Sequence, residues 1–196
     1  MEGLWGDEPP TNPAATLNAL ISKIRSVVGP SVLRGRTQLS LALPEPAQVD
    51  VEVAIAMLHG AESAVAVRAW QRAWTHALSA LFVARRTFLP EADAQWADAW
   101  RRRLAEVRIR ALDSYAKACL ELGGAELPGA ERAARELLEV APFRESAHLL
   151  LMRALAATGN AAEALVAYEQ LRTMLREELG VDPSPAVQEA YARLLG

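Results

Sequence analysis

The sequence predicts a mainly α-helical protein, an array of packed helices preceded by a short helix and β-hairpin. Three observations predict this fold. Alanine and leucine dominate a composition that is 52% apolar and 23% charged, which favours helices around a real core. Helix-start and helix-stop signals recur along the chain. An internal similarity also repeats at about 34 residues, the length of a helical repeat unit.

The length of 196 residues fits one large domain or one and a half small ones. The single cysteine, Cys119, excludes an intramolecular disulfide and fits a reducing compartment. No apolar stretch approaches the roughly 20 residues that span a bilayer. Residues 1–7 lack the basic and apolar regions of a signal peptide. We therefore expect a soluble, cytoplasmic protein that makes no membrane contact.

The charge is unevenly distributed. Residues 11–43 carry four basic side chains and no acidic one, whereas residues 44–196 carry 17 basic and 21 acidic side chains. The whole chain has a net charge of −3, which decides nothing about nucleic acid by itself. The asymmetry indicates two tasks, and we divide the chain into residues 1–43 and residues 44–196.

The first expected helix starts at Asn12-Pro13, with Asn as the N-cap and Pro at the first helical position. Gly29-Pro30 ends it. Between these signals, apolar residues at spacings of three and four form one stripe: Leu17, Leu20, Ile21, Ile24 and Val28.

A short β-hairpin is expected next. Residues 31–33 lead into the turn Arg34-Gly35-Arg36-Thr37, and residues 38–43 alternate with period two. A polar, basic helix can enter a major groove, while a basic hairpin can reach a neighbouring backbone or minor groove. The alternative is an ordinary amphipathic helix followed by a solvated loop.

Residues 50–196 are predicted to be a series of helices. Asp50 is a plausible N-cap for a helix over residues 51–58, which His59-Gly60 would end. A Ser184-Pro185 start signal precedes the last helix. The other expected helices cover residues 61–78, 94–122, 128–140, 144–158 and 161–179.

Two repeat units of tetratricopeptide type are visible in this helical region. Small residues allow close helix packing, Gly makes the turn and Pro stops the second helix. The first unit contains Tyr115, Ala118, Leu122, Gly123, Ala130, Ala134, Leu137 and Pro142. The second contains Leu151, Ala154, Thr158, Gly159, Ala164, Tyr168, Leu171 and a late Pro183.

The N-terminal segment resembles the second half of a response-regulator-type winged helix, as found in the Streptomyces antibiotic regulatory protein family. The resemblance lies in Leu4-Trp5-Gly6-Asp7-Glu8-Pro9-Pro10 and in a recognition-helix pattern. The matching positions of that pattern are Thr16, Leu17, Ser22, Lys23, Ile24 and Arg25. The chain departs from the family at Leu20, where a His is common, and at Gln38-Leu39, where a Gly-Tyr pair is common.

The family's N-terminal β-sheet and first helix have no counterpart before this segment. Either an upstream piece is missing, through a fragment or a wrongly chosen start codon, or the DNA-binding domain has decayed. The sequence leaves both explanations open.

Residues 50–196 resemble the bacterial transcriptional activator domain. The specific match is Glu177-Glu178-Leu179-Gly180-Val181-Asp182-Pro183-Ser184-Pro185, preceded by Pro142–Leu155 and Ala161–Glu169. The resemblance implies a transcription regulator whose helical domain contacts partners, forms dimers and helps to recruit RNA polymerase. The N-terminal resemblance to a winged helix implies DNA-binding residues, which we expect to be Thr16, Asn18, Ser22, Lys23, Arg25, Arg34 and Arg36.

Chemistry-bearing patterns are scarce. The three histidines have no partners at metal-ligand spacing, and no phosphate loop or nucleophile elbow is present, so we expect no enzyme, metal or cofactor. Arg101–Arg103, Arg108 and Arg110 are interpreted as a solvated helix face, because Glu106 and Asp113 lie at spacings that permit helical ion pairs. The alternative is a patch that meets DNA backbone or an acidic partner. Two tryptophan pairs spaced by four, Trp70/Trp74 and Trp96/Trp100, are interpreted as core.

Two rival functions remain open at this point. One is a protein-interaction scaffold that does not bind DNA. The other is a sensor of small molecules or peptides that uses an aromatic-lined concave face.

Overall fold

The computed structural model describes residues 2–6 and 8–196, so Asp7 of the winged-helix-like motif and the start residue Met1 lie outside the described residues. The chain divides into two compact units. One comprises residues 1–49 and 88–102, and the other comprises residues 50–87 and 103–196. We call residues 2–6 and 8–49 the N-terminal segment, and residues 50–87 and 103–196 the helical body.

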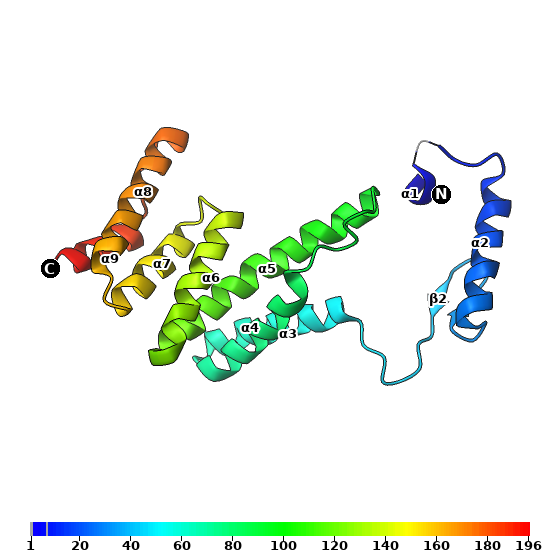
Figure 1. Ribbon diagram of the computed structural model, residues 1–196, viewed down its shortest axis with the longest axis horizontal. Helices are drawn as coiled ribbons and strands as arrows, with labels where there is room; N and C mark the ends of the chain where they lie inside the picture. The colour runs from blue at the N-terminus through cyan, green and yellow to red at the C-terminus, as the bar shows by residue number, and fades with distance from the viewer. Residues whose placement is uncertain (1, 7) are drawn as a thin grey trace. The chain divides into compact units, whose positions relative to one another are not determined.

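The N-terminal segment contains a one-turn helix, a longer helix and a small hairpin (Figure 1). Its elements are α1 (Glu2–Trp5), α2 (Pro13–Val28), β1 (Leu33–Arg34) and β2 (Ser40–Leu41). The Asn12 side chain accepts a 3.1 Å hydrogen bond from the Ala15 N–H, which confirms the predicted N-cap. The two strands pair antiparallel with Leu33 opposite Leu41, so the predicted hairpin is confirmed with shorter strands than the alternation indicated.

The remaining elements are helical, which confirms the predicted mainly α fold. They are α3 (Asp50–Ala66), α4 (Trp70–Ala84), α5 (Gln95–Leu122), η1 (Gly124–Glu126), α6 (Leu127–Val140), α7 (Glu145–Ala157), α8 (Ala161–Leu179) and α9 (Pro185–Leu195). In the helical body α3 packs on α4, α6 on α7, α7 on α8, and α9 on both α7 and α8 (Figure 1). No helix within residues 2–6 and 8–196 is long and apolar enough to cross a membrane.

The core of the helical body joins residues from α3 to α9. Leu58, Leu81, Leu112, Leu137 and Leu171 are all at most 1% exposed and belong to one apolar cluster. Alanines fill the helix–helix contacts, as the small residues of the repeat pattern predict. This cluster contains most of the buried apolar residues of the helical body, and two smaller clusters adjoin Trp74.

The predicted break at His59-Gly60 is wrong, because α3 runs through both residues to Ala66. A Cβ placed on Gly60 would overlap Nδ1 of His76 on α4 and lie 3.0 Å from its Cε1. Gly60 therefore serves the close approach of α3 and α4 and does not stop the helix. The actual break comes at residues 67–69, where Arg68 takes a φ of 56°.

Candidate nucleic-acid interface and helical surface

The residues predicted to contact DNA on α2 lie on two sides of the helix. Asn18, Ser22 and Arg25 are spaced by four and three and share one side, whereas Thr16 and Lys23 lie about half a turn away from it. Asn18, Ser22 and Lys23 are exposed. Thr16 is half-buried, and its hydroxyl donates a 3.0 Å hydrogen bond to the Asn12 carbonyl. Thr16 thus takes part in the helix start.

Arg25 connects α2 to the hairpin. Its Nε donates to the Leu33 carbonyl at 3.1 Å, and a terminal guanidinium N–H donates to the Gly35 carbonyl. Gly35 has a φ of 91°, and a Cβ there would overlap the Gln38 carbonyl oxygen. Only glycine fits this loop, and the arginine holds the loop against the end of the helix. Arg25 is half-buried and orients the hairpin.

The other two hairpin arginines are exposed. Arg34 Nε donates a 2.9 Å hydrogen bond to the Ser31 carbonyl, which leaves its terminal N–H groups open to solvent. Among the described residues, the side chains of Arg36 and Lys23 make no hydrogen bond or ion pair. The geometry brings Arg25, Arg34 and Arg36 together at one end of α2, and no carboxylate lies in this stretch of sequence.

The predicted apolar stripe of α2 is mostly exposed. Of residues 8–49, only Ile21 and Leu33 are buried apolar side chains. The exposed ones are Leu20, Ile24, Val27, Val28, Leu39, Leu41, Leu43 and Val49. The spacing predicted the helix correctly, but the structure does not bury the stripe.

The arginine-rich stretch of α5 is paired across helices. Arg110 makes a two-pronged ion pair with Glu62 of α3, with N–O distances of 2.8 and 2.6 Å. Arg101 donates to Asp98 at 2.6 Å and to the carbonyls of the preceding loop, including Phe88 at 3.0 Å. Arg108 and Arg110 thus form their ion pairs with carboxylates of other helices, whereas Arg101 pairs within α5. The Glu62 hydrogen bond has the largest effect in raising the pKa of the Arg110 guanidinium, and Glu106 adds a through-space attraction that also raises it.

Glu136 of α6 binds two arginines of other helices. Arg85 of α4 lies 2.6 Å away and Arg108 of α5 lies 2.9 Å away. Burial alone would raise the pKa of the Glu136 carboxyl, but the hydrogen bonds and charges of the two arginines outweigh it and lower the pKa. This triad links α4, α5 and α6. No local sequence pattern predicts it, because the three residues are far apart in the chain.

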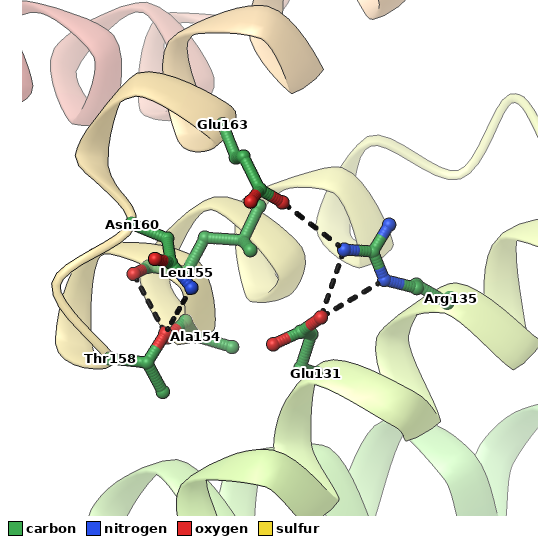
Figure 2. Close-up of polar contacts among 7 residues, drawn as sticks. All are labelled: Glu131, Arg135, Ala154, Leu155, Thr158, Asn160 and Glu163. Atoms are coloured by element: carbon green, nitrogen blue, oxygen red, sulfur yellow. Dashed lines mark hydrogen bonds and ion pairs between the residues drawn. The ribbon is translucent and has the colours of Figure 1, made fainter.

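Polar contacts also close the packing of α6, α7 and α8 (Figure 2). Arg135 of α6 lies 2.9 Å from Glu131 and 3.6 Å from Glu163 of α8. The Thr158 hydroxyl donates to the Ala154 carbonyl at 3.1 Å and ends α7. These contacts fix the turn from which α8 starts.

The Glu-Glu-Leu-Gly-x-Asp-Pro-Ser-Pro motif builds the turn between α8 and α9. Gly180 takes a φ of 70° and caps α8 in the left-handed conformation. Asp182 accepts a 3.1 Å hydrogen bond from Arg176, and the Ser184 N–H donates to Glu145 of α7 at 2.5 Å. Pro185 begins α9 as predicted. The motif is therefore a device for orienting α9.

The tryptophans divide between core and surface. The Trp74 indole N–H donates to Glu126 at 2.9 Å, and its ring lies 6.1 Å from that of Tyr115. Burial raises the pKa of the Tyr115 hydroxyl to about 12. Trp96 is 46% exposed and meets Phe88 edge-on, so its assignment to the core is wrong. Within the described residues, no group of three or more His, Cys, Asp or Glu side chains could hold a metal ion.

Comparison with known proteins gives a consistent result. The family model described as the bacterial transcriptional activator domain matches residues 49–195. Regulatory protein AfsR of Streptomyces griseus is 31% identical over 195 residues, which are 100% of this chain and 20% of AfsR. Transcriptional regulatory protein EmbR of Mycobacterium tuberculosis is 27% identical over 199 residues, which are 98% of this chain and 51% of EmbR.

The structural comparison agrees with the sequence comparison. A solved structure of Mycobacterium tuberculosis EmbR in complex with a low-affinity phosphopeptide matches with a TM-score of 0.80 at 26% identity. The match covers 99% of this chain and 52% of that one. The chain thus spans between a fifth and about half of the length of these relatives.

Proposed function

The chain belongs to the bacterial transcriptional activator domain family, and from that premise we propose that it is part of a transcription regulator that binds DNA through α2 and its hairpin. Its relatives are named as regulatory proteins, which supports regulation and gives no support to an enzyme. We assign residues 1–43 to a partial winged helix and residues 44–196 to the activator domain. The family match that starts at residue 49 supports this division.

The observation that carries the DNA-binding proposal is the junction of α2 with the hairpin. Arg25 fixes the loop through the Leu33 and Gly35 carbonyls, so Arg34 and Arg36 are held at one end of the helix. Asn18 and Ser22 are exposed on the same side of α2 as Arg25. In this proposal Asn18 and Ser22 read base edges, whereas Lys23, Arg34 and Arg36 contact phosphates.

Thr16 and Arg25 have supporting roles in this proposal. Each makes a hydrogen bond that shapes the helix start or the hairpin. Arg25 therefore contributes by orienting its neighbours, together with whatever charge its partly exposed guanidinium offers to a phosphate.

The test is binding of the full chain to a duplex with the DNA sequence upstream of its own gene, by fluorescence anisotropy over a salt series. If Lys23, Arg34 and Arg36 each neutralise one phosphate, the log–log salt slope is about −2.7. A Lys23→Ala/Arg36→Ala variant should make the slope shallower by about 1.8. The matched control is Arg68→Ala/Arg72→Ala, which removes the same charge from exposed sites of the helical body.

Equal slopes in the two double variants would contradict the proposed interface. Absence of binding at low salt would favour the second function, a protein-interaction module that does not bind DNA. The exposed apolar side chains of α2 and the hairpin favour that alternative.

Protein contacts are the other part of the proposal. We propose RNA polymerase as a partner of the helical body, which the regulatory relatives support. We also propose a homodimer through α2, where Leu20 and Ile24 are 38% and 48% exposed. Sedimentation velocity of the chain and of a Leu20→Ser/Ile24→Ser variant tests the dimer. Equal masses at all concentrations would contradict it.

A further inference from the structure

A groove of about 390 Å³ runs between α7 and α9 in the helical body. Its apolar lining comes from both helices: Leu149, Met152 and Ala156 of α7, and Ala186, Ala190 and Leu194 of α9. Arg153 of α7 and Arg193 and Glu189 of α9 complete the lining. Small alanines on α9 leave the space that longer side chains would fill, and the volume falls in the usual range of binding sites.

The groove is held open by contacts outside it. The Glu145 carboxylate at the start of α7 accepts the Ser184 N–H at the start of α9, at 2.5 Å. Tyr168 of α8 and Tyr191 of α9 stack with ring centroids 3.9 Å apart. Both contacts fix the orientation of α9 against the array without entering the groove. A partner would therefore meet a preformed surface, which lowers the entropy lost on binding.

The lining of the groove contains more basic than acidic side chains, unlike residues 44–196 as a whole. Residues 44–196 carry more acidic than basic side chains, yet the groove is lined by two arginines and one carboxylate. The Arg193 side chain is 76% exposed and lies 3.9 Å from Glu189, a loose pair. Arg153 gives one N–H to Glu121 at 2.9 Å, and a guanidinium has further donors to offer. The complementary partner is apolar and acidic.

The length of the groove indicates the shape of that partner. The lining spans residues 149–156 of α7 and 186–194 of α9, which at 1.5 Å per residue is about 10–12 Å, or two helical turns. A helix that packs on two helices places side chains at i and i+3 or i+4 between them. We propose that the α7–α9 groove binds an acidic amphipathic helix of a partner protein, with its apolar residues over Ala156 and Ala190 and its carboxylates beside Arg153 and Arg193.

The probe is a fluorescein-labelled helical peptide of about 16 residues, with Leu at i and i+4 and Glu on both flanks. A second peptide carries Lys in place of each Glu. Anisotropy with the full chain should give a Kd of about 10–100 μM for the Glu peptide, a range typical of small transient contacts. Arg193→Glu should raise that Kd about tenfold, because it reverses a charge at the groove edge. The matched control is Arg172→Glu on α8, outside the groove, which should change the Kd by less than about twofold.

Methyl NMR locates the site independently of the variants. Signals of Leu149, Met152 and Leu194 should shift when the Glu peptide is added, and those of the distant Leu58 should not. The proposal fails if the Glu peptide shows no binding at about 1 mM, or if the Lys peptide binds equally well. It also fails if Arg193→Glu and Arg172→Glu bind alike while the shifts fall outside the groove.

Discussion

The N-terminal segment and the helical body use their apolar residues in different ways. In the body, leucines such as Leu112 and Leu137 are fully buried and share one cluster that joins α3 to α9. In the N-terminal segment, α2 and the hairpin bury Ile21 and Leu33 but expose most of their other large apolar side chains, such as Val27, at 80%. Apolar side chains therefore have different roles in the two regions. In the body they are buried and stabilise the fold, whereas in the N-terminal segment most of them are exposed and can contact a partner. The same kind of substitution should therefore have unequal effects in the two regions.

The largest effect is expected from truncating a buried leucine. Leu112→Ala removes a fully buried side chain and should lower the free energy of unfolding by about 2–5 kcal/mol. Leu41→Ala makes the same chemical change at a site that is 67% exposed and should cost less than about 0.5 kcal/mol. Urea denaturation followed by circular dichroism measures both. Similar decreases in the free energy of unfolding at the two sites would contradict the proposed difference between the regions.

A smaller loss is expected at the close approach of α3 and α4. Gly60→Ala should destabilise the body by about 1–3 kcal/mol, because the new methyl group overlaps the His76 ring. In a His76→Ala background the clash is gone, and the same substitution should instead stabilise by up to about 1 kcal/mol through helix propensity. A double-mutant cycle measures the coupling. If Gly60→Ala has the same sign in both backgrounds, His76 is not the obstacle.

The charge triad should give a pH-dependent effect of about 1 kcal/mol. Arg85 and Arg108 hold the pKa of Glu136 below its ordinary value of 4.5, so the folded state is favoured by the ionised carboxylate. Its contribution is present above pH 4.5 and is lost as the pH falls through the lowered pKa. Glu136→Gln should therefore be less stable than the original protein at neutral pH and equally stable in acid. Glu139→Gln, at an exposed position of the same helix, is the control.

The smallest effect on global stability is expected at the junction of α2 and the hairpin. Arg25→Ala removes the donors to the Leu33 and Gly35 carbonyls but should change the unfolding midpoint of the body by less than about 0.5 kcal/mol. Amide hydrogen exchange should nevertheless accelerate in residues 32–42, whose local order depends on that arginine. Arg36→Ala is the matched control. Unchanged amide exchange in the Arg25 variant would show that the order of the hairpin does not depend on Arg25.

Local signals predicted most of the helix ends. Asn12-Pro13, Gly123-Gly124, Gly180 and Ser184-Pro185 act within one turn of the chain, so their chemistry can be read without a partner. The prediction at Gly60 is wrong because a glycine that permits a close helix contact cannot be distinguished, from the sequence alone, from a glycine that ends a helix. The difference lies in His76, which comes from another helix.

The candidate sites show the same limit. The basic residues of α2 and the hairpin could be listed from the sequence, but the role of Arg25 depends on carbonyls eight and ten residues away. The partners of Arg108 and Arg110 lie 28 and 48 residues away, so helical spacing could not predict these two ion pairs. The α7–α9 groove has no sequence signature, since it arises from small residues on one helix meeting a second helix at a fixed angle.

The buried thiol of Cys119 can be used to measure how often the helical body opens. It is the chain's single cysteine, it is 0% exposed, and burial raises the pKa of its thiol to about 11. A thiol-specific reagent can react only when the body opens and the thiolate forms. The labelling rate in native buffer therefore measures how often the helical array around Cys119 opens. Slower labelling in the presence of a bound partner would show that the partner reduces the opening of the helical array.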